Sequence, residues 1–300
     1  MKILTFFLIF LAGLPALASP KLKVASLHPL LSDWIKQIGG DHVDLVEIGR
    51  PGMKVHDFSP NTADLKALGQ ARVIFASGKG LETYLDDLSD ALESHQAIVD
   101  LGKSIPSLKV DASEDIYTCC PDHAVGDVDP HWWHNPRHAL RAARQIQETL
   151  VSLDPENEKS YRANFRETNK RLRTLDRWVK TQVGKIPEKQ RHLVSAHAAF
   201  GYFCKAYGFQ ATYVQGLAAT AEVPAKQLAD QIRKLRQTNI RAVFPERFAN
   251  PKVLQQIARE TGATLAPPLT ADGSVASYHD FIRNNVTTIV NALTASTAAK

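Results

Sequence analysis

The chain alternates short, apolar, strand-like segments with helical segments, and it does so in two separate stretches. Such alternation is typical of parallel sheets covered by helices, because consecutive parallel strands need a crossover connection. We therefore expect an α/β protein with two parallel-sheet lobes. The expected strands are 21–26, 43–48, 72–76 and 97–101 in the first stretch, and 193–195, 210–214, 241–244 and 263–266 in the second.

One long helical segment, 155–184, separates the two stretches. At ~1.5 Å per residue it would be about 45 Å long, which exceeds an ordinary helix within one lobe. The expected organisation is a first α/β lobe at 19–154, one long rigid linking helix at 155–186 and a second α/β lobe at 187–300. The other expected helices include 29–38, 61–68, 81–92, 198–207, 224–237, 251–261 and 278–293.

The first residues have the pattern of a secretory signal peptide. Lys2 precedes an apolar run, and the run ends in Ala-Leu-Ala18, which supplies the small residues of a cleavage site. This run is too short for a membrane span, and no later segment approaches the ~20 apolar residues that one needs. No cysteine follows it, so a lipid anchor is not expected. We predict cleavage of residues 1–18 between Ala18 and Ser19 and a soluble, periplasmic mature chain.

The charge of the chain is balanced rather than concentrated. The formal net charge is +5, and the basic residues of 155–184 are interleaved with acidic ones. A nucleic-acid track would need an unbalanced basic stripe with aromatic side chains that stack on bases. The pattern instead indicates the solvated face of a helix, and we expect no nucleic-acid partner.

Three cysteines, Cys119, Cys120 and Cys204, would enter an oxidising compartment in which disulfides form by default. Adjacent cysteines rarely bond comfortably to each other. We expect Cys119 or Cys120 to pair with Cys204 in a disulfide bond, which leaves one thiol over. Zinc binding by the adjacent pair is the alternative, but it lacks the second Cys/His pair of a structural zinc site.

The segment VDPHWWHNPRH, residues 128–138, contains three of the chain's 11 histidines. Their spacing of three, four and seven residues would place them on one face of a helix. Pro130 and Pro136 prevent this, because each removes a backbone N–H and disfavours helix at the residue before it. His131 therefore cannot share a continuous helix with His138.

The second half of this segment has the pattern of a helix start. Asn135 can supply the capping oxygen, and the proline after it suits the first helical position. His134 and His138 would then lie around the start of that helix, in solvated or packing roles rather than as metal ligands. Trp132 and Trp133 are expected to pack in the core or between the lobes.

Four polar side chains lie where ligands gather in parallel α/β proteins, at the carboxyl ends of strands. His56 follows the second expected strand, and His131 lies in a loop of the same lobe. His197 follows the first strand of the second lobe, and Asp272 follows the last strand. Three neutral imidazoles and one carboxylate suit four-coordinate Zn²⁺, whereas manganese favours more carboxylate and water ligands. We predict a zinc site made by these four residues.

Five segments, in this order and spacing, resemble the periplasmic solute-binding proteins of zinc and manganese ABC importers, the ZnuA/TroA type. They are VHDFSPNTADLKAL, ASGKGLETYLDDL, DPHWWHNP, SAHAAFGYFCKAYG and VFPERFANPKVLQQIARETGA, and the likeness covers nearly the whole mature chain. The resemblance implies a C-shaped clamp of two lobes on a rigid helix, with metal between them. It implies His56, His131, His197 and Asp272 as ligands. Histidine at the third position implies zinc, where glutamate goes with manganese or iron.

The resemblance also implies partners. The protein would deliver zinc to the membrane permease of a zinc ABC importer, and a periplasmic zinc chaperone is a further candidate partner. We expect a monomer.

Two features depart from the family. Zinc members often carry a long loop rich in histidine and aspartate before the second ligand, but here only His123 precedes the motif, which argues against zinc capture by this loop. The surroundings of Asp272 match the family weakly, so Glu246 and Glu222 are alternative carboxylate ligands. Glu246 has a second interpretation, in which it orients a ligand or closes the lobes.

Two other functions could use the same residues. A secreted zinc-dependent hydrolase would hold its metal with His56, His131 and His197 and use a carboxylate as general base. However, a site with four protein ligands leaves no position for an activated water, and the chain has no His-Glu-x-x-His motif. A manganese- or iron-binding protein of the same importer class is the other alternative. We predict a carrier that is not an enzyme.

Overall fold

The computed structural model describes residues 20–109, 128–214, 224–273 and 275–295. Every helix in these ranges is too short or too polar to cross a lipid bilayer. The predictions for the signal peptide and for Cys119, Cys120, His123 and Glu222 concern residues outside these ranges. Cys204 lies inside them, buried in helix α6, so its predicted disulfide stays a prediction.

The first lobe is built on a parallel sheet with strand order β2-β1-β3-β4. Successive residues of its strands face opposite sides, so that Val24 and Phe75 join one core cluster, whereas Ala25 and Ile74 join another. The sheet is therefore covered on both faces, as is usual for parallel strands. Its elements are β1 Leu22–Ser26, α1 Pro29–Gly39, β2 Val43–Glu47, α2 Thr62–Leu68, β3 Val73–Ala76, α3 Leu85–Asp90 and β4 Ala97–Asp100.

The second lobe repeats this plan with shorter strands. β5 pairs with β6 and β7 pairs with β8, all in parallel, and a parallel bridge from Ser195 to Phe244 joins β5 to β7. Val194 and Val243 pack with residues of α7 and α8, whereas Leu193 belongs to the main core cluster. The elements are β5 His192–Ser195, α6 Gly201–Tyr207, β6 Gln210–Tyr213, α7 Ala225–Thr238, β7 Ala242–Val243, α8 Lys252–Thr261, β8 Thr264–Leu265 and α9 Tyr278–Thr294.

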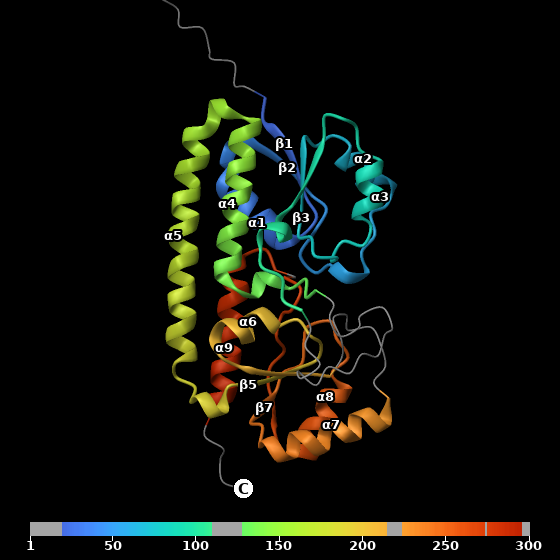
Figure 1. The fold of residues 1–300 in the computed structure, drawn as a ribbon, viewed down its shortest axis with the longest axis vertical. Coiled ribbons are helices and arrows are strands. Elements are labelled where there is room, and N and C mark those ends of the chain that lie inside the picture. The colour runs from blue at the N-terminus through green and yellow to red at the C-terminus, as the bar shows by residue number, and fades with distance from the viewer. Residues whose placement is uncertain (1–19, 110–127, 215–223, 274, 296–300) are drawn as a thin grey trace, which may run out of the picture.

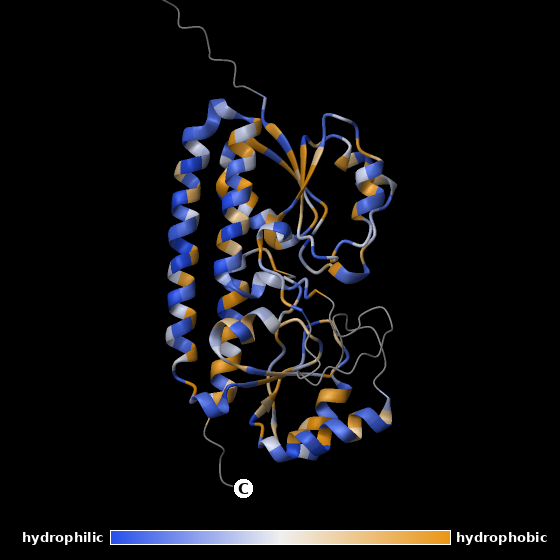
Figure 2. Ribbon diagram, in the orientation of Figure 1, coloured by the Kyte–Doolittle hydropathy of each residue, from blue (hydrophilic) through white to orange (hydrophobic). Residues whose placement is uncertain are grey.

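The long helix α5 (Glu158–Val183) runs along one side of both lobes, and α4 (Pro136–Leu153) lies beside it along the first lobe (Figure 1). Asn135 caps α4 by accepting a hydrogen bond from the Arg137 backbone N–H at 3.0 Å, as its sequence predicts. α5 is about 39 Å long at ~1.5 Å per residue, and it packs on α1 of the first lobe and on α9 of the second. Figure 2 shows α5 as mostly hydrophilic, whereas the strands are largely hydrophobic. The predicted class, two parallel α/β lobes joined by a long helix, is confirmed.

Some helix starts differ from those predicted. α3 begins at Leu85 rather than at 81, because the Glu82 carboxylate accepts hydrogen bonds from the Ser77 and Gly78 backbone N–H groups and holds 77–82 in a turn. α6 begins at Gly201 rather than at 198, after a turn that follows β5. The linking helix begins at 158, after a 3-10 turn at 155–157.

Candidate metal centre

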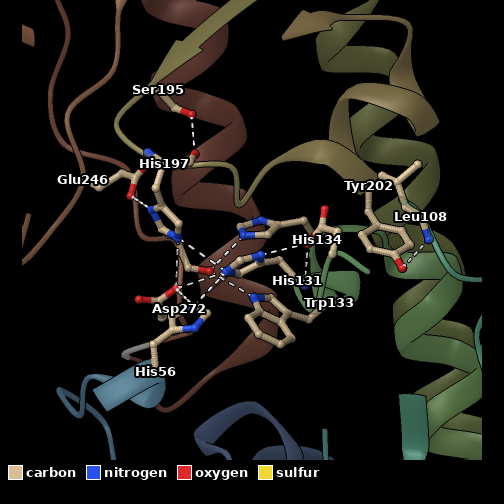
Figure 3. A network of polar contacts seen from close by, with 12 residues as sticks. His56, Leu108, His131, Trp133, His134, Ser195, His197, Tyr202, Glu246 and Asp272 are labelled. Carbon is tan, nitrogen blue, oxygen red and sulfur yellow. Dashed lines mark hydrogen bonds and ion pairs between the residues drawn. The ribbon is translucent and has the colours of Figure 1, made fainter. Parts of the chain in front are cut away.

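The structure brings together all four residues that the sequence predicts as ligands. His56 lies on a 3-10 turn after β2, and His131 lies directly before another 3-10 turn at Trp132–His134. His197 follows β5, and Asp272 follows β8. One nitrogen of each imidazole and one carboxylate oxygen lie within 4.8 Å of one another, and Figure 3 shows the four side chains pointing toward a common point between the lobes.

The distances between the four facing atoms are those of a small coordination shell. The Nε2 atom of His131 lies 2.9 Å from His56 Nε2 and 3.4 Å from His197 Nε2. Asp272 Oδ1 lies 3.7–3.8 Å from the three nitrogens. Ligand atoms at ~2.0 Å from a tetrahedral ion are about 3.3 Å apart. These five separations bracket this value, and the sixth, between the ring nitrogens of His56 and His197, is within 4.8 Å, so a modest inward movement of the side chains would seat a divalent ion.

Asp129 fixes the orientation of His131. Its Oδ1 atom accepts hydrogen bonds from the His131 backbone N–H and from Nδ1, both at 2.8 Å. With the proton on Nδ1, the lone pair of Nε2 faces the other ligands. Burial lowers the pKa of His131 well below its usual value, and the neighbouring imidazoles of His56 and His197 add to this effect. The ring is therefore neutral, as a metal ligand must be.

Glu246 fixes the orientation of His197 in the same way. One carboxylate oxygen accepts from the His197 backbone N–H at 3.1 Å, and the other bonds to His197 Nδ1. Burial alone would lower the pKa of His197, but the Glu246 carboxylate raises it to about 9. Because both oxygens of Glu246 face His197, the geometry matches its expected role as an orienting group rather than as the fourth ligand.

Asp272 provides an anionic atom without a hydrogen-bond donor. Its Oδ1 is buried and has no hydrogen-bond partner among the described residues. Burial acts to raise the pKa of Asp272, but the imidazoles of His56 and His197 outweigh it and hold the pKa at about 2. The carboxylate is therefore ionised at neutral pH. A buried carboxylate without a hydrogen-bond donor is costly unless a cation lies close to it. In the metal-free protein the His197 ring, whose pKa is raised, lies 3.7 Å from Oδ1, and the three imidazole nitrogens surround the point that a metal ion would occupy.

A small pocket of about 60 Å³ connects the site to solvent. Lys54, Asp57, Arg247 and Phe248 help to line it. The four ligand side chains differ in their exposure to solvent. Asp272 and His56 are 26% and 17% exposed, whereas His131 and His197 are 0% and 2% exposed. The two histidines that carboxylates orient are thus the two least exposed of the four.

The remaining histidines of VDPHWWHNPRH stay outside the cluster, as expected. His134 is 1% exposed and its Nε2 lies 2.8 Å from the Ala271 carbonyl. His138 lies in the first turn of α4, and its ring contacts the ring of Tyr202. Trp132 and Trp133 are buried, in agreement with a packing role.

Asp129 was not among the residues predicted to support the site. The signal was present, because an aspartate two residues before a histidine, with proline between them, can fold back onto the backbone N–H of that histidine. The polar contacts of Trp133 and His134 were not predicted either, and both side chains donate hydrogen bonds to the Ala271 carbonyl.

Comparisons with known proteins agree with this architecture. The model of the family described as zinc-uptake complex component A, periplasmic, matches residues 24–292. The metal ABC transporter substrate-binding lipoprotein FimA of Streptococcus parasanguinis is 28% identical, over 97% of this chain and 98% of that protein. The iron-binding protein YfeA of Yersinia pestis is also 28% identical, over 92% and 87%.

Solved structures share the fold. The periplasmic zinc binding protein TroA from Treponema pallidum has a TM-score of 0.79 and 24% identity, over 92% of this chain and 100% of that one. A Mn-bound periplasmic metal binding protein from Candidatus Liberibacter asiaticus has a TM-score of 0.81 and 24% identity, over 91% and 100%. The family match spans both lobes and all four clustered residues. The chain therefore belongs to this family of periplasmic, metal-binding components of ABC importers, and it is a carrier rather than an enzyme.

Proposed function

We propose that this protein captures Zn²⁺ between its two lobes, outside the cytoplasm, and delivers it to the permease of an ABC importer. His56, His131, His197 and Asp272 are the proposed ligands. The observation that carries the proposal is the convergence of three imidazole Nε2 atoms and one carboxylate oxygen within 4.8 Å. Two of these imidazoles are held by carboxylates on their far nitrogens, which is the usual support of a metal-binding histidine.

The donor set favours zinc over manganese. Zn²⁺ accepts nitrogen and oxygen donors in a four-coordinate shell, whereas Mn²⁺ favours six-coordinate shells rich in oxygen. Here three of the four proposed donors are nitrogens, and the nearby carboxylate of Glu246 is occupied by His197. A manganese- or iron-carrying protein is the second candidate, because relatives of similar identity are named as an iron-binding protein and a manganese-binding lipoprotein.

The coordination number of the bound metal distinguishes a zinc carrier from a manganese carrier better than affinity does. Most nitrogen and oxygen sites bind Zn²⁺ more tightly than Mn²⁺, whatever their natural metal. We suggest loading the metal-free protein with Co²⁺ and recording its visible spectrum. A zinc-type site should give the intense absorption of four-coordinate Co²⁺, and one equivalent of Zn²⁺ should abolish it. The weak absorption of six-coordinate Co²⁺ would favour the manganese alternative.

The remaining predictions belong to the same proposal. Residues 1–18 would be removed on export, and Cys204 would form a disulfide with Cys119 or Cys120. A mature chain whose mass corresponds to a start at Ser19 and is two hydrogen atoms lower than that of the fully reduced chain would support the cleavage and one disulfide. The protein would act as a monomer, with the permease as its essential partner and a periplasmic zinc chaperone as a further partner that supplies Zn²⁺.

A further inference from the structure

Two buried side chains of the first lobe hold the residue that precedes Asp272. Trp133 Nε1 donates to the Ala271 carbonyl at 3.0 Å, and His134 Nε2 lies 2.8 Å from the same oxygen. Because a carbonyl can only accept, the His134 ring carries its proton on Nε2. Both side chains are 1% exposed. The partners are 138 and 137 residues apart in sequence, so these bonds join two segments that are distant in the chain.

This arrangement bears directly on Asp272. The Ala271 carbonyl and the Asp272 backbone nitrogen belong to one planar peptide unit. Two donors on that carbonyl fix the plane and thereby the direction in which the Asp272 side chain leaves the backbone. Asn285 of α9 holds Thr270 from the other side through two hydrogen bonds, at 2.9 and 2.7 Å. The loop before Asp272 is thus fixed from both directions.

The segment after Asp272 is also bound to the first lobe. Gly273 has a φ of 64°, and a side chain there would come within 2.6 Å of Leu30 and 2.9 Å of His28. Tyr278 donates from its hydroxyl to the Trp133 carbonyl at 2.8 Å. Its backbone N–H donates to the Asp33 carboxylate, also at 2.8 Å. The chain therefore returns to the first lobe on both sides of the carboxylate.

We infer that Trp133 and His134 are positioning residues that hold Asp272 against the first lobe. Asp272 then forms one rigid group with His56 and His131, although it lies near the end of the chain. His197, held by Glu246 next to the second sheet, is the single ligand outside this group. The inference rests on the proposed role of Asp272 as a metal ligand.

The test is a double-mutant cycle on zinc affinity. His134→Phe removes the donor but suits the site, because the ring packs between Phe200 and Phe281, with centroids at 4.4 and 5.1 Å. Zinc affinity of the full mature chain would be measured by chelator competition in the natural background and in Asp272→Ala. We expect about tenfold weaker binding in the natural background, the scale of losing a group that orients a ligand. No further loss is expected when Asp272 is already absent.

Two further variants keep the test decisive. Trp133→Phe removes the other donor and should give the same pattern if His134→Phe fails to fold. His138→Phe, in the same segment but without a bond to Ala271, should leave the affinity unchanged. Equal losses in both backgrounds would overturn the inference, because they would indicate a general effect on the fold. An unchanged affinity in Asp272→Ala would instead refute the proposed ligand itself, and with it the inference.

Discussion

Asp129 Oδ1 accepts two hydrogen bonds from one residue, His131, through its backbone N–H and its Nδ1. Glu246 does the same for His197 with its two oxygens. Each lobe thus orients one proposed ligand by binding its main chain and its ring to a single carboxylate. In the first lobe the carboxylate is two residues away, and in the second it is 49 residues away. The two rings are held in place before any metal arrives.

The ligand assignment predicts the effect of removing His197. His197→Ala should lower zinc affinity by at least a hundredfold, because one of four donors is lost. The protein should remain folded, since its core clusters do not depend on this ring. Chelator competition and circular dichroism would measure both properties. His95→Ala, which removes an exposed histidine far from the cluster in sequence, is the control, and an unchanged affinity in His197→Ala would exclude this ligand.

The orienting carboxylates should also matter for affinity, but less. Asp129→Ala is expected to weaken zinc binding about 10–100-fold. Asp129→Asn retains an oxygen that accepts the same hydrogen bonds, so its loss should be smaller. The same titration measures both variants. Equal losses in the two variants would show that the charge of Asp129, and not its hydrogen-bond geometry, supports His131.

Zinc binding should release a proton from His197. The pKa of this residue in the metal-free protein is raised to about 9, so the ring is protonated at neutral pH, and a metal must displace that proton. Affinity should therefore increase about tenfold per pH unit as the pH rises from about 6.5 toward about 9.

Calorimetry at about pH 7.5 in buffers of different ionisation enthalpy would count this proton. Close to one proton per zinc is expected in the natural protein. Glu246→Gln removes the charge that raises the pKa, so it should release clearly less. A binding enthalpy that does not depend on the buffer would contradict the prediction.

Gly273 should tolerate no side chain. Gly273→Ala would place a methyl group against Leu30 and His28, and its φ of 64° is unfavourable for alanine. Gly52→Ala is the matched control, because Gly52 has a φ of 88° but nothing within 4 Å of the added carbon. We expect Gly273→Ala to lower the free energy of unfolding by about 1–3 kcal/mol more than Gly52→Ala. Urea denaturation would measure the difference, and equal effects would mean that Leu30 and His28 yield freely.

Metal release should change the shape of the molecule only slightly. α5 packs on α1 of the first lobe and on α9 of the second, and one core cluster includes residues from both lobes. A helix shared in this way resists bending more than a flexible linker does. Small-angle scattering of the metal-free and zinc-loaded protein should give nearly equal radii of gyration. A large difference would show that the lobes move apart despite this shared core.

The sequence predicted the class of fold and the four clustered residues, because local patterns showed where the strands end. Strand periodicity located the carboxyl ends of the strands, and the parallel arrangement placed His56, His197 and Asp272 at those ends. The start of α3 was missed, because the contact of Glu82 with the Ser77 backbone overrides helical propensity. The bonds from Trp133 and His134 to Ala271 could not be predicted, since they depend on how distant segments pack.

The unequal exposure of the four proposed ligands has a consequence for how a bound ion would be handed on. An incoming donor atom from a partner or chelator can approach from the side of Asp272 and His56, but not from the side of His131 and His197. Ligand exchange should therefore be stepwise and begin at the carboxylate. The ion would remain bound to the two shielded imidazoles while a new bond forms, so that transfer need not pass through the free, hydrated cation.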